Sequence, residues 1–397
     1  MGACTSTCFL VEDSIIKPNL NIIIMESENI DDDLKITNQA YQKVKLLGTG
    51  SYGKVYLIKS LQTQKEYALK ETVITKTKEF FEYFSMNEIN ILSKLDNPYI
   101  ISIKCAFKTQ VDEDTEKLNI IMEYVDNGDL NQLLIDNKFD EDYFEEKRLL
   151  NWLFQICLAL IYLQKHDIIH RDIKPSNIFL MADDTIKLGD FGLSKKASLN
   201  SDVKIYIGTP IYSSPELISK KDFSFKTDIW SLGVTFLQLI SLKTPFLGYE
   251  EGNIQENITK KNINEKIMNK EKNGFNEYII EKYSKELLDL IDEMISINPE
   301  ERPNAVDILN RNIIRHRMEE FLKENNFNQN EVNNTIDNIN KEISEYYLKN
   351  EDRTISTKEK RKNINNIKNL IKKKEFLKKM IIIDNYSKNN FQTIEVK

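Results

Sequence analysis

The sequence predicts an α+β fold with a small strand-rich lobe, a larger helix-rich lobe and a helical C-terminal tail. Three observations support this. Short β-like runs cover residues 41–47, 54–58, 67–70, 100–107 and 118–124. After Gly128 the pattern becomes mostly helical, and from about Arg317 onward Gly and Pro are absent while Asn, Lys, Glu and Ile dominate. We therefore divide the chain into a head (1–40), a two-lobed domain (41–316) and a tail (317–397).

Composition excludes several classes of protein. With 397 residues, 41% hydrophobic and 29% charged, the chain is neither a short disulfide scaffold, nor collagen-like, nor wholly disordered. A net charge of -7 argues against a nucleic-acid partner. No apolar run approaches the roughly 18 residues that a membrane-spanning helix needs. The four cysteines are scattered, which indicates a reducing, cytoplasmic setting rather than a disulfide framework.

The elements follow one another in a clear order. The head carries seven acidic residues and one base between Glu12 and Asp33, and we expect it to be largely disordered. A helix is expected near 76–95, among the β-like runs. The two lobes join near 123–128. The apolar stretch 149–164 is long enough to form a buried helix.

A glycine-rich segment lies between the first two β-like runs, with Gly48, Gly50 and Gly53 in it. Glycines allow backbone N–H groups to approach phosphate oxygens closely. An ordinary glycine-rich hairpin turn is the alternative. A strand rather than a helix follows, which excludes a dinucleotide-binding fingerprint, and the Gly-Lys-Ser/Thr ending of a P-loop is missing.

Lys70 ends the apolar run 67–70, about one hairpin beyond these glycines, so its ammonium could face the same phosphates. A buried ammonium needs a carboxylate partner. Glu88 on the following helix is the favoured candidate, with Glu79 and Glu82 as alternatives.

Residues 170–177 (His-Arg-Asp-Ile-Lys-Pro-Ser-Asn) carry the most informative pattern. Asp172 can accept a hydroxyl proton, Lys174 can neutralise charge on a transferred phosphoryl group, and Asn177 can offer an amide oxygen to magnesium. Asp190 follows a strand-like run, where its carboxylate suits the same hard cation. The alternatives are a polar turn after a buried helix and an ordinary Asp-x-Gly turn.

These motifs, in this order, resemble the protein kinase family over residues 41–316. The resemblance implies a two-lobed kinase fold that binds ATP and Mg²⁺ between its lobes and transfers the γ-phosphoryl group to protein substrates. Lys174 together with Thr209 resembles the serine/threonine class, and the phrases 186–195 and 208–216 are similar to NIMA-related kinases. Further matches are Gly208-Thr209-Pro210, Ser214-Pro215-Glu216, Asp228–Gly233 and Arg302-Pro303.

The resemblance implies a role for each matching residue. Asp172 would be the catalytic base, assisted by Lys174, and Lys70, positioned by Glu88, would bind the α and β phosphates. Asn177 and Asp190 would bind magnesium. The implied nucleotide contacts are Gly48, Gly50 and Gly53 at the phosphates, Leu47, Val55, Ala68, Met122 and Phe179 around adenine, the backbones of Glu123 and Val125, and Asp129 at the ribose. The implied structural contacts are a Glu216–Arg302 bridge and Asp228 bracing the catalytic loop.

One position departs from the family. Many such kinases carry a phosphorylatable residue where this chain has Ile205, and Arg171 would normally bind that phosphate. Ser198, Ser201 or Tyr206 could substitute, or activity could be independent of a phosphate.

Two other functions compete with a protein kinase. A pseudokinase-like scaffold would bind ATP without catalysis. Such degenerate members of the family usually lack the lysine or an aspartate of the catalytic set, and this chain has the complete set. A small-molecule phosphotransferase is the weaker rival, since the segment 214–216 supports a peptide-docking surface in the family.

Both ends carry further signals. Gly2 with Ser6 fits the myristoylation pattern, and Cys4 and Cys8 are candidates for palmitoylation, so we expect an anchor on the cytoplasmic face of a membrane. A frayed terminus is the alternative. Residues 358–380 hold ten bases against two acids, with apolar residues at helical spacing. This helix could contact anionic lipid, bind a calmodulin-like partner, inhibit the kinase or pack on the second lobe.

Overall fold

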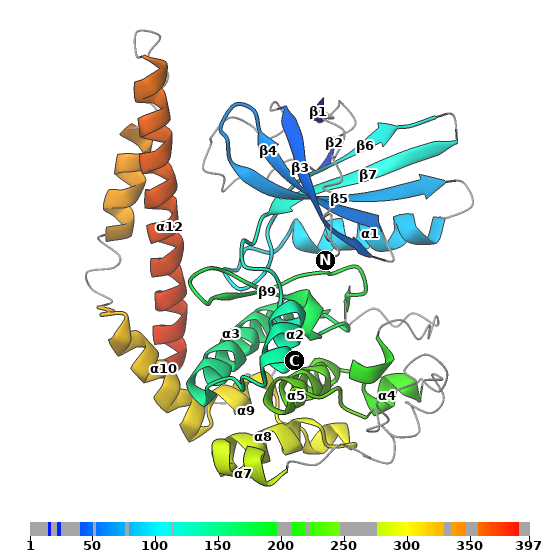
Figure 1. Ribbon diagram of the computed structural model, residues 1–397, viewed down its shortest axis with the longest axis vertical. Coiled ribbons are helices and arrows are strands. Elements are labelled where there is room, and N and C mark those ends of the chain that lie inside the picture. Colours follow the sequence, from blue (N-terminus) through cyan, green and yellow to red (C-terminus); the bar gives the residue numbers. More distant parts are fainter. Residues whose placement is uncertain are drawn as a thin grey trace, which may run out of the picture. The chain divides into compact units, whose positions relative to one another are not determined.

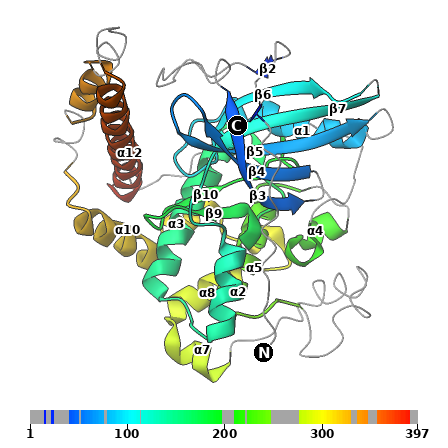
Figure 2. The same cartoon turned by 45° about the horizontal axis from the view of Figure 1, so that its top comes forward.

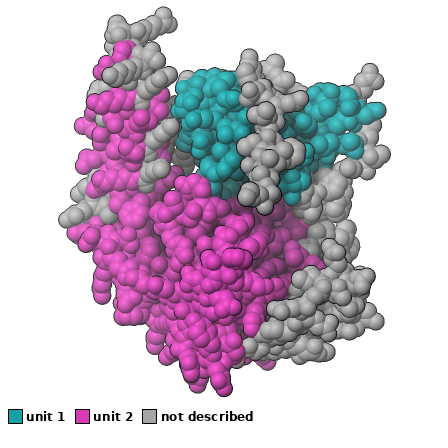
Figure 3. All heavy atoms as spheres, in the orientation of Figure 1, with its two compact units in different colours: residues 1–96, 101–125 teal, residues 97–100, 126–397 magenta. Residues whose placement is uncertain are grey.

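The computed structural model describes residues 15–16, 22–24, 40–50, 53–75, 79–112, 114–196, 209–219, 223–246, 276–328, 335–345 and 356–388. The chain divides into two compact units. The first comprises residues 1–96 and 101–125, and the second comprises 97–100 and 126–397 (Figure 3).

The first unit is an antiparallel sheet with strand order β1-β3-β4-β5-β7-β6-β2 (Figure 1). The helix α1 (Glu79–Leu92) packs against β5, β6 and β7. All five predicted strands and the predicted helix are confirmed. Their bounds are β3 Tyr41–Gly50, β4 Gly53–Ser60, β5 Glu66–Thr75, β6 Ile103–Gln110 and β7 Thr115–Glu123.

Two further strands lie in the head. β1 (Ile15–Ile16) pairs with β3, and β2 (Ile22–Ile24) pairs with β6. The head was expected to be largely disordered; these two short segments are exceptions, and the rest of residues 1–39 lies outside the described residues. The physical reason is that β-branched isoleucines suit strands, and the edges of β3 and β6 offer unpaired backbone groups.

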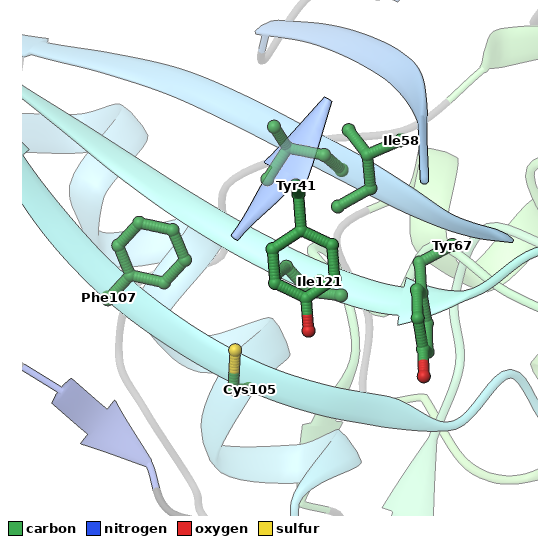
Figure 4. Packing of buried hydrophobic residues seen from close by; sticks show 7 residues of the cluster. Tyr41, Ile58, Tyr67, Cys105, Phe107 and Ile121 are labelled. Carbon is green, nitrogen blue, oxygen red and sulfur yellow. The ribbon is translucent and has the colours of Figure 1, made fainter. Parts of the chain in front are cut away.

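The sheet has a core on each face. On one face the rings of Tyr41 and Tyr67 meet edge-on, with centroids 5.8 Å apart (Figure 4). Neighbouring residues on β7 serve opposite faces, as the strand period of two requires: Ile121 joins this cluster and Ile120 joins the other. The first cluster contains Tyr41, Ile58, Tyr67, Leu69, Cys105, Phe107 and Ile121, and the second contains Ile74, Ile89, Ala106, Leu118 and Ile120.

The second unit is mainly helical and is built around α3 (Glu146–Lys165), which contains the predicted helix 149–164. Most of α3 is buried, which explains its strongly apolar sequence. Together with the first unit's sheet, this confirms the two-lobed class of fold. The other elements are α2 Leu130–Asp140, β8 Ile168–Ile169, η2 Pro175–Asn177, β9 Ile178–Leu180, β10 Ile186–Leu188, β11 Lys195–Lys196, η3 Pro210–Tyr212, α4 Pro215–Ile218, α5 Lys226–Ser241, α7 Glu277–Lys282, α8 Lys285–Met294, η4 Pro299–Glu301, α9 Ala305–Leu309, α10 Asn312–Glu324 and α12 Thr357–Lys388.

The tail is mainly helical where it is described. α10 runs across the predicted domain boundary at residues 316–317, so the tail continues directly from the domain. A helix over residues 335–345 lies beside α12 (Figures 1 and 2), and its Ile339 and Ile343 are buried. None of the helices among the described residues is long and apolar enough to cross a membrane.

Candidate active site

The glycines of the glycine-rich segment lie on the paired ends of β3 and β4. Gly50 pairs with Gly53, and Gly48 pairs with Val55. Gly53 has φ +148°, and a Cβ there would lie 2.0 Å from the backbone oxygen of Glu71, so only glycine fits. A Cβ on Gly48 would meet no atom within 4 Å, so the protein itself does not require glycine at that position.

Lys70 on β5 is paired with Glu88 on α1. The Nζ–Oε2 distance is 2.6 Å, and the side chains are 12% and 2% exposed. Of the three candidate partners, Glu82 binds Lys108 instead, at 2.7 Å, and the side chain of Glu79 lies outside the described parts. A carboxylate from the helix thus holds the largely buried ammonium of the strand lysine.

The predicted adenine-facing residues of the first unit lie on four neighbouring strands: Leu47 on β3, Val55 on β4, Ala68 on β5 and Met122 on β7. Ala68 and Met122 are direct register partners. At the end of β7, the amide of Glu123 donates to the Ser102 oxygen at 3.0 Å, so a contact of Glu123 with adenine would use its carbonyl. Val125, the last residue of this unit, is buried.

The second unit brings the predicted catalytic residues together. Asp172 Oδ2 accepts hydrogen bonds from Lys174 Nζ at 2.7 Å and Asn177 Nδ2 at 2.9 Å. Lys174 Nζ also donates to Thr209 Oγ1 at 2.9 Å. Asp172 is only 6% exposed, so the ammonium beside it compensates a carboxylate that is largely removed from water.

The backbone of this loop is held by Asp228 on α5, as the resemblance implied. The amides of His170 and Arg171 donate to its two carboxylate oxygens, each at 2.8 Å. His170 lies 3.1 Å from the Gly189 oxygen through Nε2 and accepts the Asp172 amide at Nδ1, which assigns the proton to Nε2. Burial lowers the pKa of His170 and raises that of Asp228.

Asn177 and Asp190 offer donors suited to a hard cation. Asn177 Nδ2 donates to the backbone oxygen of Asp172 at 2.8 Å and to Asp172 Oδ2 at 2.9 Å. The side-chain amide oxygen of Asn177 is thus the atom that could bind a metal. The Gly189 amide donates to the Asn177 oxygen at 2.9 Å, tying the residue before Asp190 to the Asn177 turn. An amide oxygen and a carboxylate fit magnesium chemically.

Asp129 has a structural role that the sequence interpretation missed. Its Oδ1 accepts the Asn131 and Gln132 amides, each at 2.9 Å, and so caps the N-terminus of α2. Burial raises its pKa. The position of Asp129 directly before a helical stretch is the sequence signal that could have indicated this cap. Asp129 also forms a β-bridge with Phe179, which places the predicted ribose contact next to a predicted adenine contact.

Glu216 and Arg302 form the implied buried bridge, with Nη1–Oε1 at 2.7 Å and Nη2–Oε2 at 2.8 Å. The side chains are 5% and 0% exposed. Burial acts to raise the pKa of Glu216, but the hydrogen bonds and charge of Arg302 outweigh it, and the pKa lies below its ordinary value.

The aromatic ring of Phe223 was not predicted. The Arg171 guanidinium lies 5.3 Å from its centroid and Lys195 Nζ lies 5.5 Å from it. Burial and then the charge of Arg171 lower the pKa of Lys195. The ring thus contacts two neighbouring cations in the region where a phosphate was expected. Ile205 and the candidate phosphosites Ser198, Ser201 and Tyr206 lie outside the described residues.

The sheet with its lysine–glutamate pair and the Asp172 cluster define the class: the chain belongs to the protein kinase family, whose domain profile matches residues 41–314. Members of this family use ATP and Mg²⁺.

Within the family the chain is similar to NIMA-related kinases, as predicted. It is 36% identical over 287 residues to serine/threonine-protein kinase Nek1 of Mus musculus, covering 72% of this chain and 22% of that protein. It is 36% identical over 311 residues to probable serine/threonine-protein kinase nek3 of Dictyostelium discoideum (77% and 26%). It is 34% identical over 284 residues to serine/threonine-protein kinase Nek5 of Homo sapiens (71% and 37%). The matches thus span between 22% and 37% of the length of these relatives.

Proposed function

We propose that this protein is a serine/threonine protein kinase that transfers the γ-phosphoryl group of ATP to protein hydroxyls. The hydrogen-bonded cluster of Asp172, Lys174 and Asn177 is the observation that carries the proposal. A polar turn without a catalytic role would not need a nearly buried carboxylate held by an ammonium and an amide.

In this proposal Asp172 orients the substrate hydroxyl and accepts its proton as the oxygen attacks phosphorus. Lys174 lies on the same carboxylate oxygen and stabilises the charge on the transferred group. Lys70, fixed by Glu88, binds the α and β phosphates. Magnesium, held by Asn177 and Asp190, would neutralise phosphate charge when bound.

The test is transfer of radiolabelled phosphate from ATP to a peptide library, with wild type beside Asp172→Asn. Loss of a general base lowers such rates by about 10²–10⁴-fold. Asp289→Asn, an exposed position on α8, is the matched control and should retain full activity. Equal transfer by Asp172→Asn and wild type would contradict the assignment of the base.

The same assay separates a kinase from the pseudokinase-like alternative. A scaffold would bind ATP but transfer no phosphate in the wild-type protein. The intact set of Lys70, Glu88, Asp172, Asn177 and Asp190 favours catalysis.

The hydrogen bond from Lys174 to Thr209 supports serine and threonine, rather than tyrosine, as the substrates, because this pair marks that class in the family resemblance. A library with matched Ser, Thr and Tyr acceptors measures this preference. Phosphate incorporation confined to tyrosine would contradict it.

We also propose that acylation of Gly2 and Cys4 anchors the protein to the cytoplasmic face of a membrane. The support is the sequence pattern alone, because both residues lie outside the described parts. One myristoyl chain binds membranes with K of only about 10⁴ M⁻¹, so the cysteine supplies the second signal. Gly2→Ala should move the protein from the membrane fraction to the soluble fraction, and unchanged fractionation would contradict the anchor.

Lipid or calmodulin-like contact by residues 358–380 is a weaker proposal. Ile367, Lys379 and Met380 are buried within the second unit, so such a partner would have to displace the helix first.

A further inference from the structure

The C-terminal helix α12 buries a lysine among apolar residues. Lys379 is 7% exposed, beside Met380 at 2% and Ile383 at 1%. The preceding residue, Lys378, is exposed. A lysine is seldom buried unless it is paired. The partner of Lys379 therefore identifies the surface on which α12 is built to pack.

That partner is the turn that joins β9 to β10. Lys379 Nζ donates to Thr185 Oγ1 at 3.0 Å and lies 3.4 Å from Asp183 Oδ2. The Thr185 amide donates to the other carboxylate oxygen, Oδ1, at 3.0 Å. Burial lowers the pKa of Lys379, while the Lys379 charge and the Thr185 hydrogen bonds bring the pKa of Asp183 below its ordinary value despite burial.

The helix α3 holds the same turn from another direction. Arg148 binds Asp184 through Nη2 at 2.7 Å and Nε at 3.0 Å, and Gln155 Oε1 accepts the Ile186 amide at 2.9 Å. Asp184 has a positive φ of 63°. This backbone conformation is unfavourable for a residue other than glycine, so the turn depends on contacts with its neighbours. The turn is thus fixed by α3 and α12 together.

A second contact secures the end of α12. Lys165, the last residue of α3, lies 3.4 Å from the Tyr386 hydroxyl and 5.8 Å from the centre of its ring. The tail helix also packs on α10, which continues directly from the domain.

We propose that α12 is a clamp on the β9–β10 hairpin and that Lys379 is a positioning residue for Asp190, which follows β10. An apolar residue such as Met380 can pack on many surfaces, whereas a buried ammonium needs oxygen atoms as hydrogen-bond acceptors. Lys379 therefore fixes the register of the helix on the turn. The effect on magnesium binding rests on the function proposed above for Asp190.

The test is Lys379→Met, with Lys378→Met as the control that removes the same charge one residue away. Loss of a hydrogen-bonded charged partner should speed amide exchange of residues 178–188 by about tenfold. It should also raise the Mg²⁺ concentration that half-saturates the kinase, by about the same factor. Lys378→Met should change neither.

A double-mutant cycle with Asp183→Asn should give less than additive effects, since both changes remove one interaction. If Lys379→Met fails to fold, Thr185→Val removes one partner without removing a charge and is expected to speed exchange in the same hairpin.

Equal hairpin exchange in the Lys379→Met and Lys378→Met proteins would overturn the clamp. Faster exchange with unchanged magnesium dependence would overturn the positioning role. Absence of phosphate transfer by wild type would instead refute the proposed kinase activity, and the exchange measurement, which needs no catalysis, would still decide the clamp.

Discussion

Glu216→Gln tests the buried bridge to Arg302, because it removes the carboxylate charge and leaves a guanidinium that is 0% exposed. Breaking such a pair costs about 3–5 kcal/mol. Arg302 keeps hydrogen bonds to the carbonyls of Ser296 at 2.7 Å, Lys226 at 3.0 Å and Ile297 at 3.2 Å, so we expect the lower end, about 3 kcal/mol. For a domain of this size that corresponds to a fall in Tm of roughly 6–12 °C.

Calorimetry or circular dichroism measures this fall, with Glu300→Gln, an exposed position, as the control. Because the folded-state pKa of Glu216 lies below its ordinary value of 4.5, its stabilisation is complete above that pH and is lost as the pH falls through the folded pKa. The difference in Tm between wild type and Glu216→Gln should therefore shrink below about pH 4.5. A Tm change at neutral pH no larger than that of Glu300→Gln would refute the reasoning.

Three further predictions concern single side chains. Gly53→Ala should destabilise the protein by about 1–3 kcal/mol and raise the KM for ATP, because its Cβ would meet a backbone oxygen at 2.0 Å, whereas Gly48→Ala has open space and should leave Tm nearly unchanged. Lys70→Met should weaken ATP binding measured by calorimetry and lower Tm, since the buried Glu88 carboxylate then loses the Lys70 ammonium; an unchanged Kd would contradict the role of the lysine. Phe223→Leu should lower stability by about 1–2 kcal/mol through loss of two cation–π contacts, Phe223→Tyr should retain them, and equal melting of the two variants would count against the contacts.

The sequence predicted the strands and the large helices of the domain because their signals are local. Short runs rich in β-branched and aromatic residues mark β4 and β5, and a long, strongly apolar stretch marks α3. The Lys70–Glu88 pair was reachable by the same reasoning, because a buried ammonium on a strand needs a carboxylate from the next element. The bracing by Asp228 and the Glu216–Arg302 bridge were expected only through the family resemblance.

The contacts that the sequence did not predict join segments far apart in the chain. In these segments the residue that makes the contact does not differ in type from its neighbours. Ten basic residues lie between Lys358 and Met380, and nothing in the sequence distinguishes Lys379, which is buried, from Lys378, which is not. The strand β2 was hidden among acidic residues that suggested disorder. In each of these cases pairing with a distant strand or turn decides the outcome, and local propensity does not.

We propose that Lys70, Asp172, Asn177 and Asp190 all act on one ATP. A crystal structure of the wild-type chain with Mg²⁺ and a non-hydrolysable ATP analogue tests it most directly. We predict Lys70 Nζ within hydrogen-bond distance of the α or β phosphate, and oxygens of Asn177 and Asp190 about 2.1 Å from magnesium. A triphosphate bound without Lys70, or magnesium held by other residues, would contradict the account.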